Sequence, residues 1–293
     1  MTRVAAIDIG TNTTRLLVAD VDGDRIDDVV RRSTVTRLGE GVDARRRLLP
    51  VPVARTRNAL ADYRRELESL GAERTLAVAT SAARDAENGE AFLGEIEWSY
   101  GFATRLLSGA EEAELTRRGV GATAANTLVV DIGGGSTELI LPGFETSIDI
   151  GSVRLTERFL HGDPPTSAEL DEAAAYVRGL LPELRVDAAI GVAGTVTQLH
   201  LIAGKLTVEV IEREVARLAG LTITELERVP EMDPARAPVI VGGALVVREV
   251  VRRYRLPELG WSERDLLDGV ALEAASMLPR GEGEAPPSAF TAC

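Results

Sequence analysis

Residues 128–141 read LVVDIGGGSTELIL, and this stretch decides how the chain folds. It begins with Leu128, Val129 and Val130, an apolar run typical of a buried strand. Asp131 and the glycine-rich segment follow, and a second apolar run returns at residues 139–141. The pattern therefore predicts two strands joined by a tight turn.

The glycines of this turn indicate a phosphate site. Gly133, Gly134 and Gly135 carry no side chains, so backbone N–H groups can converge there on an anion, and φ > 0 is permitted. The flanking carboxylates, Asp131 and Glu138, suit a hard cation such as Mg²⁺ that accompanies a phosphate. A simple structural turn explains the glycines equally well.

The same pattern occurs a second time, near the start of the chain. Residues 4–18 read VAAIDIGTNTTRLLV: an apolar strand, Asp8, Ile9, Gly10, small polar residues and another apolar strand. Asp8 and Asp131 occupy the same place in the two copies. We expect one hairpin in each half of the chain, the two facing each other across a cleft and gripping one phosphate chain.

Composition and charge narrow the class of protein. The chain has 293 residues, 45% hydrophobic and 27% charged, which is ordinary for two soluble globular domains. Its net charge of −13 argues against nonspecific nucleic-acid binding, so arginines, loop amides and metal ions must make a phosphate site locally positive. The start lacks a signal-peptide pattern, the apolar run 237–247 is too short to span a bilayer, and Cys293 has no cysteine to pair with. We expect a cytoplasmic protein with no membrane partner.

Several enzyme classes are excluded by what the sequence lacks. Lys205 is the only lysine and lies in no Walker A sequence, so neither a P-loop nor a protein-kinase site can be built. His161 and His200 are the only histidines, they are isolated, and no G-x-S-x-G sequence appears. A Ser-His-Asp hydrolase or a zinc enzyme is therefore not expected.

Three further segments carry candidate ligands. Strand 74–79 is followed by a small-residue turn with Arg84, which we read either as a ligand contact or as a surface arginine paired with a nearby acid. Ser108 and Glu111 form a capping box at the start of helix 108–119, which explains Glu111 and leaves Glu112 unassigned. The turn at Gly194 and Thr195 leaves helix amides for an anion or is simply close-packed.

The expected domain boundary is the GVGATAAN segment at residues 119–126. It gives an N-terminal domain at 1–120 and a C-terminal domain at 121–293, of which 280–293 is expected to be a disordered tail. Helices are expected over 53–70, 108–119, 167–184, 236–254 and 265–278, and further strands over 26–35, 74–79, 103–107, 145–150 and 188–192.

Six motifs in this order resemble the exopolyphosphatase/guanosine pentaphosphate phosphatase (Ppx/GppA) family. They are DIGTNTTRLLVAD (8–20), ATSAARDAEN (79–88), SGAEEAEL (108–115), VVDIGGGSTEL (129–139), GVAGTVTQL (191–199) and VIVGGAL (239–245). The resemblance implies an α/β fold of two ribonuclease H-like domains, of the actin, Hsp70 and sugar-kinase superfamily, with the active site in the cleft between them. It also implies that residues 262–279 pack back on the first domain.

The resemblance also assigns roles to residues. The family's general base falls on Glu112, and its phosphate-neutralising arginine falls on Arg84. Its metal carboxylates fall on Asp131, Glu138 and Asp8, with Mg²⁺ as the expected cofactor and a monovalent cation as a further candidate. The implied phosphate ligands are Gly10, Thr11, Asn12, Thr13, Gly133, Gly134, Gly135, Ser136, Thr137, Gly194 and Thr195.

The implied reaction is hydrolysis of a terminal phosphoanhydride by an in-line water that Glu112 deprotonates. The expected substrate is short-chain inorganic polyphosphate, with hydrolysis of pppGpp to ppGpp as the alternative. Only 4% of residues are aromatic, and Trp98 and Trp261 lie outside the phosphate motifs, so a stacking site for guanine is not evident. A small-molecule kinase or a non-catalytic phosphate or nucleotide sensor is less consistent with the presence of Glu112. The sequence does not decide whether the protein forms a homodimer.

Overall fold

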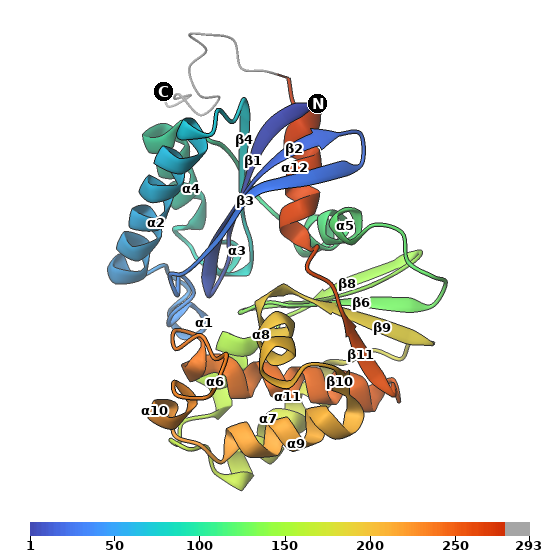
Figure 1. The fold of residues 1–293 in the computed structure, drawn as a ribbon. Helices are drawn as coiled ribbons and strands as arrows, with labels where there is room; N and C mark the ends of the chain where they lie inside the picture. The colour runs from blue at the N-terminus through green and yellow to red at the C-terminus, as the bar shows by residue number, and fades with distance from the viewer. Residues whose placement is uncertain (279–293) are drawn as a thin grey trace. The chain divides into compact units, whose positions relative to one another are not determined.

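The structure is a computed structural model that describes residues 1–278. The chain forms two compact units (Figure 1). Unit 1 is Met1–Gly121 together with the described residues from Leu266 onward, and unit 2 is Ala122–Asp265. The chain therefore passes from unit 1 to unit 2 within the GVGATAAN segment. The tail predicted over 280–293 lies outside the described residues.

Unit 1 is built on a five-stranded mixed sheet in the order β3-β2-β1-β4-β5. The first three strands are antiparallel neighbours, whereas β4 runs parallel to β1 and β5 runs parallel to β4. Its elements are β1 (Thr2–Ile9), β2 (Thr13–Asp22), β3 (Arg25–Val35), α1 (Val42–Arg45), α2 (Pro50–Ser69), β4 (Arg74–Ala79), α3 (Ser81–Asp85), α4 (Gly89–Tyr100), β5 (Ala103–Leu106), α5 (Gly109–Val120) and α12 (Leu266–Ser276).

The alternation of side chains along β1 builds two cores, one on each face of this sheet. Ala5 and Ile7 pack on one face with buried residues of α2 and α4, such as Leu60. Val4 and Ala6 belong to the core on the other face, which α5 and α12 cover. The C-terminal helix α12 is thus part of unit 1, against β1, β2, β4 and α5.

Unit 2 is built on a six-stranded sheet in the order β10-β11-β9-β6-β7-β8. Its elements are β6 (Thr127–Ile132), β7 (Thr137–Leu141), β8 (Phe144–Ile148), α6 (Ser152–Phe159), α7 (Ser167–Leu180), β9 (Ala188–Val192), α8 (Ala193–Ala203), β10 (Leu206–Thr207), α9 (Val208–Ala219), α10 (Ile223–Leu226), α11 (Ala237–Arg253) and β11 (Glu258–Trp261). The apolar helix α11 forms the centre of its core, in contact with α6, α7, α8 and α9.

The two sheets share one topology. In each, three antiparallel strands are followed by a parallel strand added beside the first, so β8-β7-β6-β9 repeats the arrangement of β3-β2-β1-β4. The repetition extends well beyond the hairpin that the sequence shows. The predicted α/β fold, with two mixed sheets flanked by helices, is confirmed.

Several elements differ from the sequence-based expectation. Helices α4, α6 and α9 were not predicted, and α7 ends at Leu180 rather than at residue 184. Helix α7 begins at Ser167 with Thr166 as its N-cap, whose side chain forms a capping box with Glu169. Over residues 1–278, no helix combines the length and the apolar character that a membrane crossing requires.

Candidate phosphate and catalytic site

The hairpin between β1 and β2 has the tight turn that its sequence predicts. The N–H group of Gly10 donates to the carbonyl oxygen of Thr13 at 3.0 Å, which closes the turn. A Cβ atom on Gly10 would lie 2.9 Å from that oxygen, so only glycine fits there without a shift of the backbone. The φ of Gly10 is not positive. This close approach, and not a left-handed backbone conformation, is therefore what requires a glycine at this position.

Backbone groups of residues 36–39 fix the outer side of this turn. The N–H groups of Thr36 and Arg37 donate to the carbonyl oxygen of Asn12 at 3.0 and 2.9 Å, and Gly39 donates to Thr11 at 2.8 Å. The carbonyl oxygens of Thr11, Asn12 and Thr13 therefore all accept hydrogen bonds. This arrangement leaves the amide groups of the turn to face an anion.

Asn12 and Thr13 add side-chain groups to the same turn. Their exposed fractions are 6% and 8%, and within residues 1–278 no hydrogen-bond partner exists for the amide oxygen and nitrogen of Asn12 or for the hydroxyl of Thr13. Buried polar groups are nearly always hydrogen-bonded, because leaving one unsatisfied costs about 1–3 kcal/mol. These groups are suited to a polar ligand.

The hairpin between β6 and β7 repeats this construction. Gly133 closes the turn by donating to the carbonyl of Ser136 at 3.1 Å. The N–H groups of residues 152–154, at the start of α6, donate to the carbonyls of Gly133 and Gly134 at 2.8 to 3.1 Å. Within residues 1–278, the N–H groups of Gly134 and Gly135 have no backbone acceptor. In this turn too, the carbonyl oxygens accept hydrogen bonds, and the amide groups of Gly134 and Gly135 remain for a ligand.

Arg154 supports the loop in a way that the sequence does not indicate. Its Nε donates to the carbonyl of Gly135 at 2.7 Å, and its side chain is buried. Gly151 lies so close to the loop that a Cβ atom there would sit 2.5 Å from the carbonyl of Gly134. These contacts make the segment 151–154 the support of the second turn, as residues 36–39 are of the first. None of the three glycines at 133–135 has a positive φ.

The two hairpins differ at one cross-strand pair. Asp8 is the register partner of Arg15, and Asp131 is the register partner of Glu138. Arg15 forms an ion pair with Asp8, with Nη2 2.8 Å from Oδ2. The charge of Asp8 is therefore compensated within its own hairpin, whereas Asp131 has a second carboxylate opposite it.

The pair Asp131 and Glu138 fits a hard cation. Both residues are buried, with exposed fractions of 5% and 1%, and directly opposite residues of a sheet have Cβ atoms about 4.5–5.5 Å apart. Two buried carboxylates at that separation are disfavoured unless a cation or proton lies near them. The Ser147 hydroxyl donates to Oε1 of Glu138 at 2.7 Å and orients it.

Within residues 1–278, no group of three His, Cys, Asp or Glu residues could hold a metal. Mg²⁺ typically takes only one or two carboxylates, with substrate phosphates and water completing its shell.

Arg84 and Glu112 are in direct contact in unit 1. Arg84 lies in the last turn of α3, and Glu112 lies in the first turn of α5. Nη1 of Arg84 donates to Oε2 of Glu112 at 3.1 Å and to the carbonyl of Leu107 at 2.8 Å. Glu112 is 6% exposed, so the carboxylate is held in a mostly buried ion pair at the carboxyl ends of β4 and β5.

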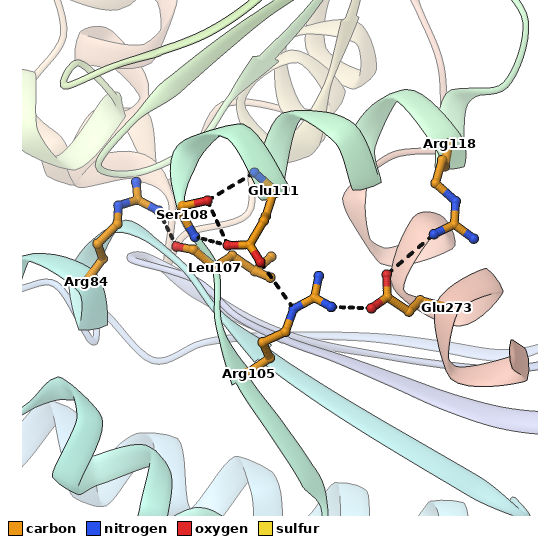
Figure 2. A network of polar contacts seen from close by, with 7 residues as sticks. All are labelled: Arg84, Arg105, Leu107, Ser108, Glu111, Arg118 and Glu273. Atoms are coloured by element: carbon orange, nitrogen blue, oxygen red, sulfur yellow. Dashed lines mark hydrogen bonds and ion pairs between the residues drawn. The ribbon is translucent and has the colours of Figure 1, made fainter. Parts of the chain in front are cut away.

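Glu111 has a different environment from its neighbour. It forms the predicted capping box: the Ser108 hydroxyl and N–H both donate to its Oε2, and its own N–H donates to the Ser108 hydroxyl (Figure 2). The hydrogen bonds from Ser108 hold the pKa of Glu111 below its usual value. Glu111 is therefore occupied as a helix cap, which separates it in role from Glu112.

A polar network ties both ends of α5 to the C-terminal helix α12 (Figure 2). Glu273 of α12 forms ion pairs with Arg105 of β5 and with Arg118 of α5. Arg105 also lies 3.9 Å from Glu111. Through these contacts α12 holds in place the helix that carries Glu112.

The turn from β9 into α8 brings an arginine that sequence reasoning missed. Ala193 has a φ of 65°, a left-handed conformation that is costly for a residue with a side chain. The Arg236 guanidinium packs against Gly194, where a Cβ atom would lie 2.3 Å from Nη1. Thr195 is buried beside Gly243 of α11. The Gly194 turn is therefore close-packed. The guanidinium of Arg236 lies beside it, although Arg236 is far from Gly194 in the sequence.

Two further residues make contacts that the sequence does not indicate. Trp261, which the sequence puts outside the phosphate motifs, donates from Nε1 to the hydroxyl of Thr197 at 3.2 Å and stacks on His200 at 4.3 Å between ring centroids. Lys205 pairs with Glu258 at the β10 and β11 edge of the sheet.

Comparison with known proteins places this chain among phosphatases. The sequence model of the Ppx/GppA phosphatase family matches residues 17–278. Exopolyphosphatase 2 of Mycobacterium tuberculosis is 43% identical over 94% of this chain and 99% of its own length. The crystal structure of an exopolyphosphatase-like protein aligns with a TM-score of 0.86 and 33% identity, over 93% of this chain and 97% of that one. An exopolyphosphatase from Cytophaga hutchinsonii aligns with a TM-score of 0.85 and 25% identity, over 92% and 96%.

Proposed function

Because the chain belongs to the Ppx/GppA phosphatase family, we propose that it is an exopolyphosphatase, a hydrolase that releases the terminal phosphate of inorganic polyphosphate. The observation that supports this reaction best is the contact between Arg84 and Glu112. A buried carboxylate beside a guanidinium offers both groups that hydrolysis of an anhydride requires, a base for water and a cation for the phosphate.

In the proposed reaction, Arg84 exchanges its partner when substrate binds. The terminal phosphate takes the guanidinium, because a charge-assisted and often bidentate contact with phosphate is a strong one. Glu112 is then released to accept a hydrogen bond from the attacking water and to remove its proton in line with the breaking P–O bond. Arg84 offsets the charge that develops on the phosphate oxygens.

The hairpins hold the phosphates in this proposal. The amide groups around Gly10–Thr13 and Gly133–Thr137 donate to phosphate oxygens, with the side chains of Asn12 and Thr13 as further ligands. The amides of Gly194 and Thr195 and the guanidinium of Arg236 contribute another cationic region in unit 2.

We further propose that Asp131 and Glu138 hold Mg²⁺, which when bound supplies charge compensation for the phosphate oxygens. Their burial and their cross-strand pairing support this assignment. Asp8 is the third candidate carboxylate, and it forms an ion pair with Arg15. We expect short chains to be preferred, and pppGpp to be a poorer substrate than polyphosphate.

One observation favours the alternative, hydrolysis of pppGpp. Trp261 is 37% exposed, is stacked with His200 and contacts Thr197 within the GVAGTVTQL motif, so an aromatic surface for a base exists near a candidate phosphate turn. Phosphate release from polyphosphate, pppGpp and ATP, measured with Mg²⁺ and with EDTA, decides between the two activities. The substitution Trp261→Ala should leave release from polyphosphate unchanged.

A further inference from the structure

A strap of residues 36–48 connects two candidate phosphate-binding segments of unit 1. At its start, residues 36–39 donate to the carbonyls of the first hairpin. At its end, the carbonyl of Arg46 accepts from the N–H of Glu87 at 2.8 Å, and Leu48 exchanges two hydrogen bonds with the Asn88 side chain, at 2.8 and 3.1 Å. The strap is therefore fixed by hydrogen bonds at both ends.

The second half of the strap carries a basic run, Arg45, Arg46 and Arg47. All three side chains are exposed, and within residues 1–278 neither Arg45 nor Arg47 forms a side-chain hydrogen bond or ion pair. Arg46 has a left-handed φ of 52°, and its Nη1 lies 3.9 Å from Oδ1 of Asp85. The backbone is held in a conformation that presents three neighbouring guanidinium groups to solvent.

This run stands out against the charge of the rest of the protein. The net charge is −13, and other exposed arginines mostly pair with carboxylates, as Arg65 does with Asp62 and Arg117 does with Glu114. With Asp43 as an acidic neighbour on α1, the run keeps a positive excess. Three adjacent exposed guanidinium groups, of which only that of Arg46 has an ion-pair partner among the described residues, are suited to a polyanion in an acidic protein.

The position of the run relates it to Arg84. Helix α1, at whose end the run lies, packs against α3, whose last turn carries Arg84. Asp85 is the next residue after Arg84, and its carboxylate is the one that Arg46 approaches. An extended anion whose terminal phosphate lies at Arg84 can therefore continue along the basic run.

We propose that Arg45, Arg46 and Arg47 form a distal subsite for inorganic polyphosphate, which binds phosphates behind the one that is cleaved. The subsite deepens the proposed exopolyphosphatase function and rests on it. Polyphosphate matches the run because it carries a charge on every phosphate along a flexible chain, whereas tripolyphosphate is too short to engage Arg84 and the whole run together. The subsite makes affinity rise with chain length only until the chain spans from Arg84 to the run, so it agrees with the expected preference for short chains over long ones.

The kinetic test compares tripolyphosphate with a longer polyphosphate in the full chain. The double substitution Arg45→Ala/Arg47→Ala should raise KM for the longer substrate by roughly three- to tenfold, as expected for a few exposed ion contacts, and leave kcat and the KM for tripolyphosphate unchanged. It should also weaken the salt dependence of the longer substrate's KM, because fewer contacts release fewer counterions.

The matched control, Arg213→Ala/Arg228→Ala, removes two exposed arginines of unit 2 and should change neither KM. An unchanged KM for the longer substrate, or an equal rise for both, overturns the subsite.

A binding test needs no turnover. Phenylglyoxal modifies exposed arginines, and peptide mass spectrometry locates the labels. In EDTA, the longer polyphosphate should protect Arg45, Arg46 and Arg47, while Arg213 and Arg228 stay reactive. Equal labelling of the run with and without polyphosphate contradicts the subsite, even if the enzyme hydrolyses polyphosphate. Protection in a protein that releases no phosphate contradicts the proposed function and leaves the subsite standing.

Discussion

Nη1 of Arg84 lies 3.1 Å from Oε2 of Glu112, so the two residues that the sequence motifs single out, 28 positions apart, meet in one mostly buried ion pair. The glutamate next to it, Glu111, is used as a helix cap. The contact gives the two neighbouring glutamates different environments, and it makes their substitutions the sharpest comparison within unit 1.

The substitution Glu112→Gln should lower kcat by about 10²- to 10⁴-fold, the usual contribution of a general base, while polyphosphate still binds. The amide keeps the size of the side chain but cannot take a proton from water. Initial rates of phosphate release and equilibrium binding of polyphosphate measure the two effects separately.

Glu111→Gln is the matched control. It should keep most of the activity and lose part of the capping box, which in helices is worth about 0.5–2 kcal/mol of unfolding free energy. If Glu111→Gln proved the crippling change and Glu112→Gln the mild one, the assignment within the pair would be reversed.

Arg84→Ala should mainly raise KM for polyphosphate, since the guanidinium is proposed to bind the terminal phosphate in this acidic protein. Arg84→Lys keeps the charge without the planar fork and should fall between the alanine variant and the wild type. Steady-state kinetics on all three proteins test this order. A KM for Arg84→Ala equal to that of the wild type would remove the residue from the site.

Stability at acidic pH should depend on Glu169 at the start of α7. Its carboxylate accepts hydrogen bonds from the backbone and hydroxyl of Thr166 and from the backbones of His161 and Gly162, which lowers its pKa from 4.5 to about 2. Because the pKa in the folded state lies below that in the unfolded state, the stabilisation is present above pH 4.5 and is lost as the pH falls toward 2.

The difference in unfolding free energy between the wild type and Glu169→Gln should therefore be largest near neutral pH and shrink below pH 4.5. Urea denaturation at a series of pH values measures it. The exposed Glu172→Gln, on the same helix, is the control and should have the smaller effect at neutral pH. A difference that grows as the pH falls would contradict the assigned shift.

Gly269 should be intolerant of a side chain. A Cβ atom at this position of α12 would lie 1.9 Å from the carbonyl oxygen of Leu115 in α5. Gly269→Ala should destabilise the protein by about 1–3 kcal/mol, as overpacking does. The control is Gly94→Ala in α4, where nothing lies within 4 Å and where alanine should stabilise the protein by about 0.4–1 kcal/mol. Thermal denaturation of both variants should show shifts of opposite sign, and shifts of one sign would refute the packing argument.

The sequence predicts the hairpins well because their information is local. An apolar strand, an aspartate, a glycine and a returning strand specify a turn within a dozen residues, and both turns have the predicted form. The pairing of Asp8 with Arg15 and of Asp131 with Glu138 also follows from equal spacing in the two copies, once the register is known. Only the register shows that the aspartate lies opposite an arginine in one hairpin and opposite a glutamate in the other.

The remaining parts depend on contacts between distant segments. The supports of the two turns, residues 36–39 and 151–154, resemble ordinary loops in the sequence, and Arg236 reaches Gly194 only because α11 packs beside α8. Helix α9 was not predicted, although the sequence contains its N-cap residue, Thr207. The duplication of the whole sheet could not be read from the sequence, since only the hairpins keep a common pattern.

Phosphate release from polyphosphate, pppGpp and ATP, measured side by side at equal concentrations with Mg²⁺ and with EDTA, tests the central claim most directly. We expect kcat/KM to be highest for polyphosphate, clearly lower for pppGpp and negligible for ATP, with all release abolished by EDTA and by Glu112→Gln. A clear preference for pppGpp over tri- and tetraphosphate, or activity that survives both EDTA and Glu112→Gln, would contradict it.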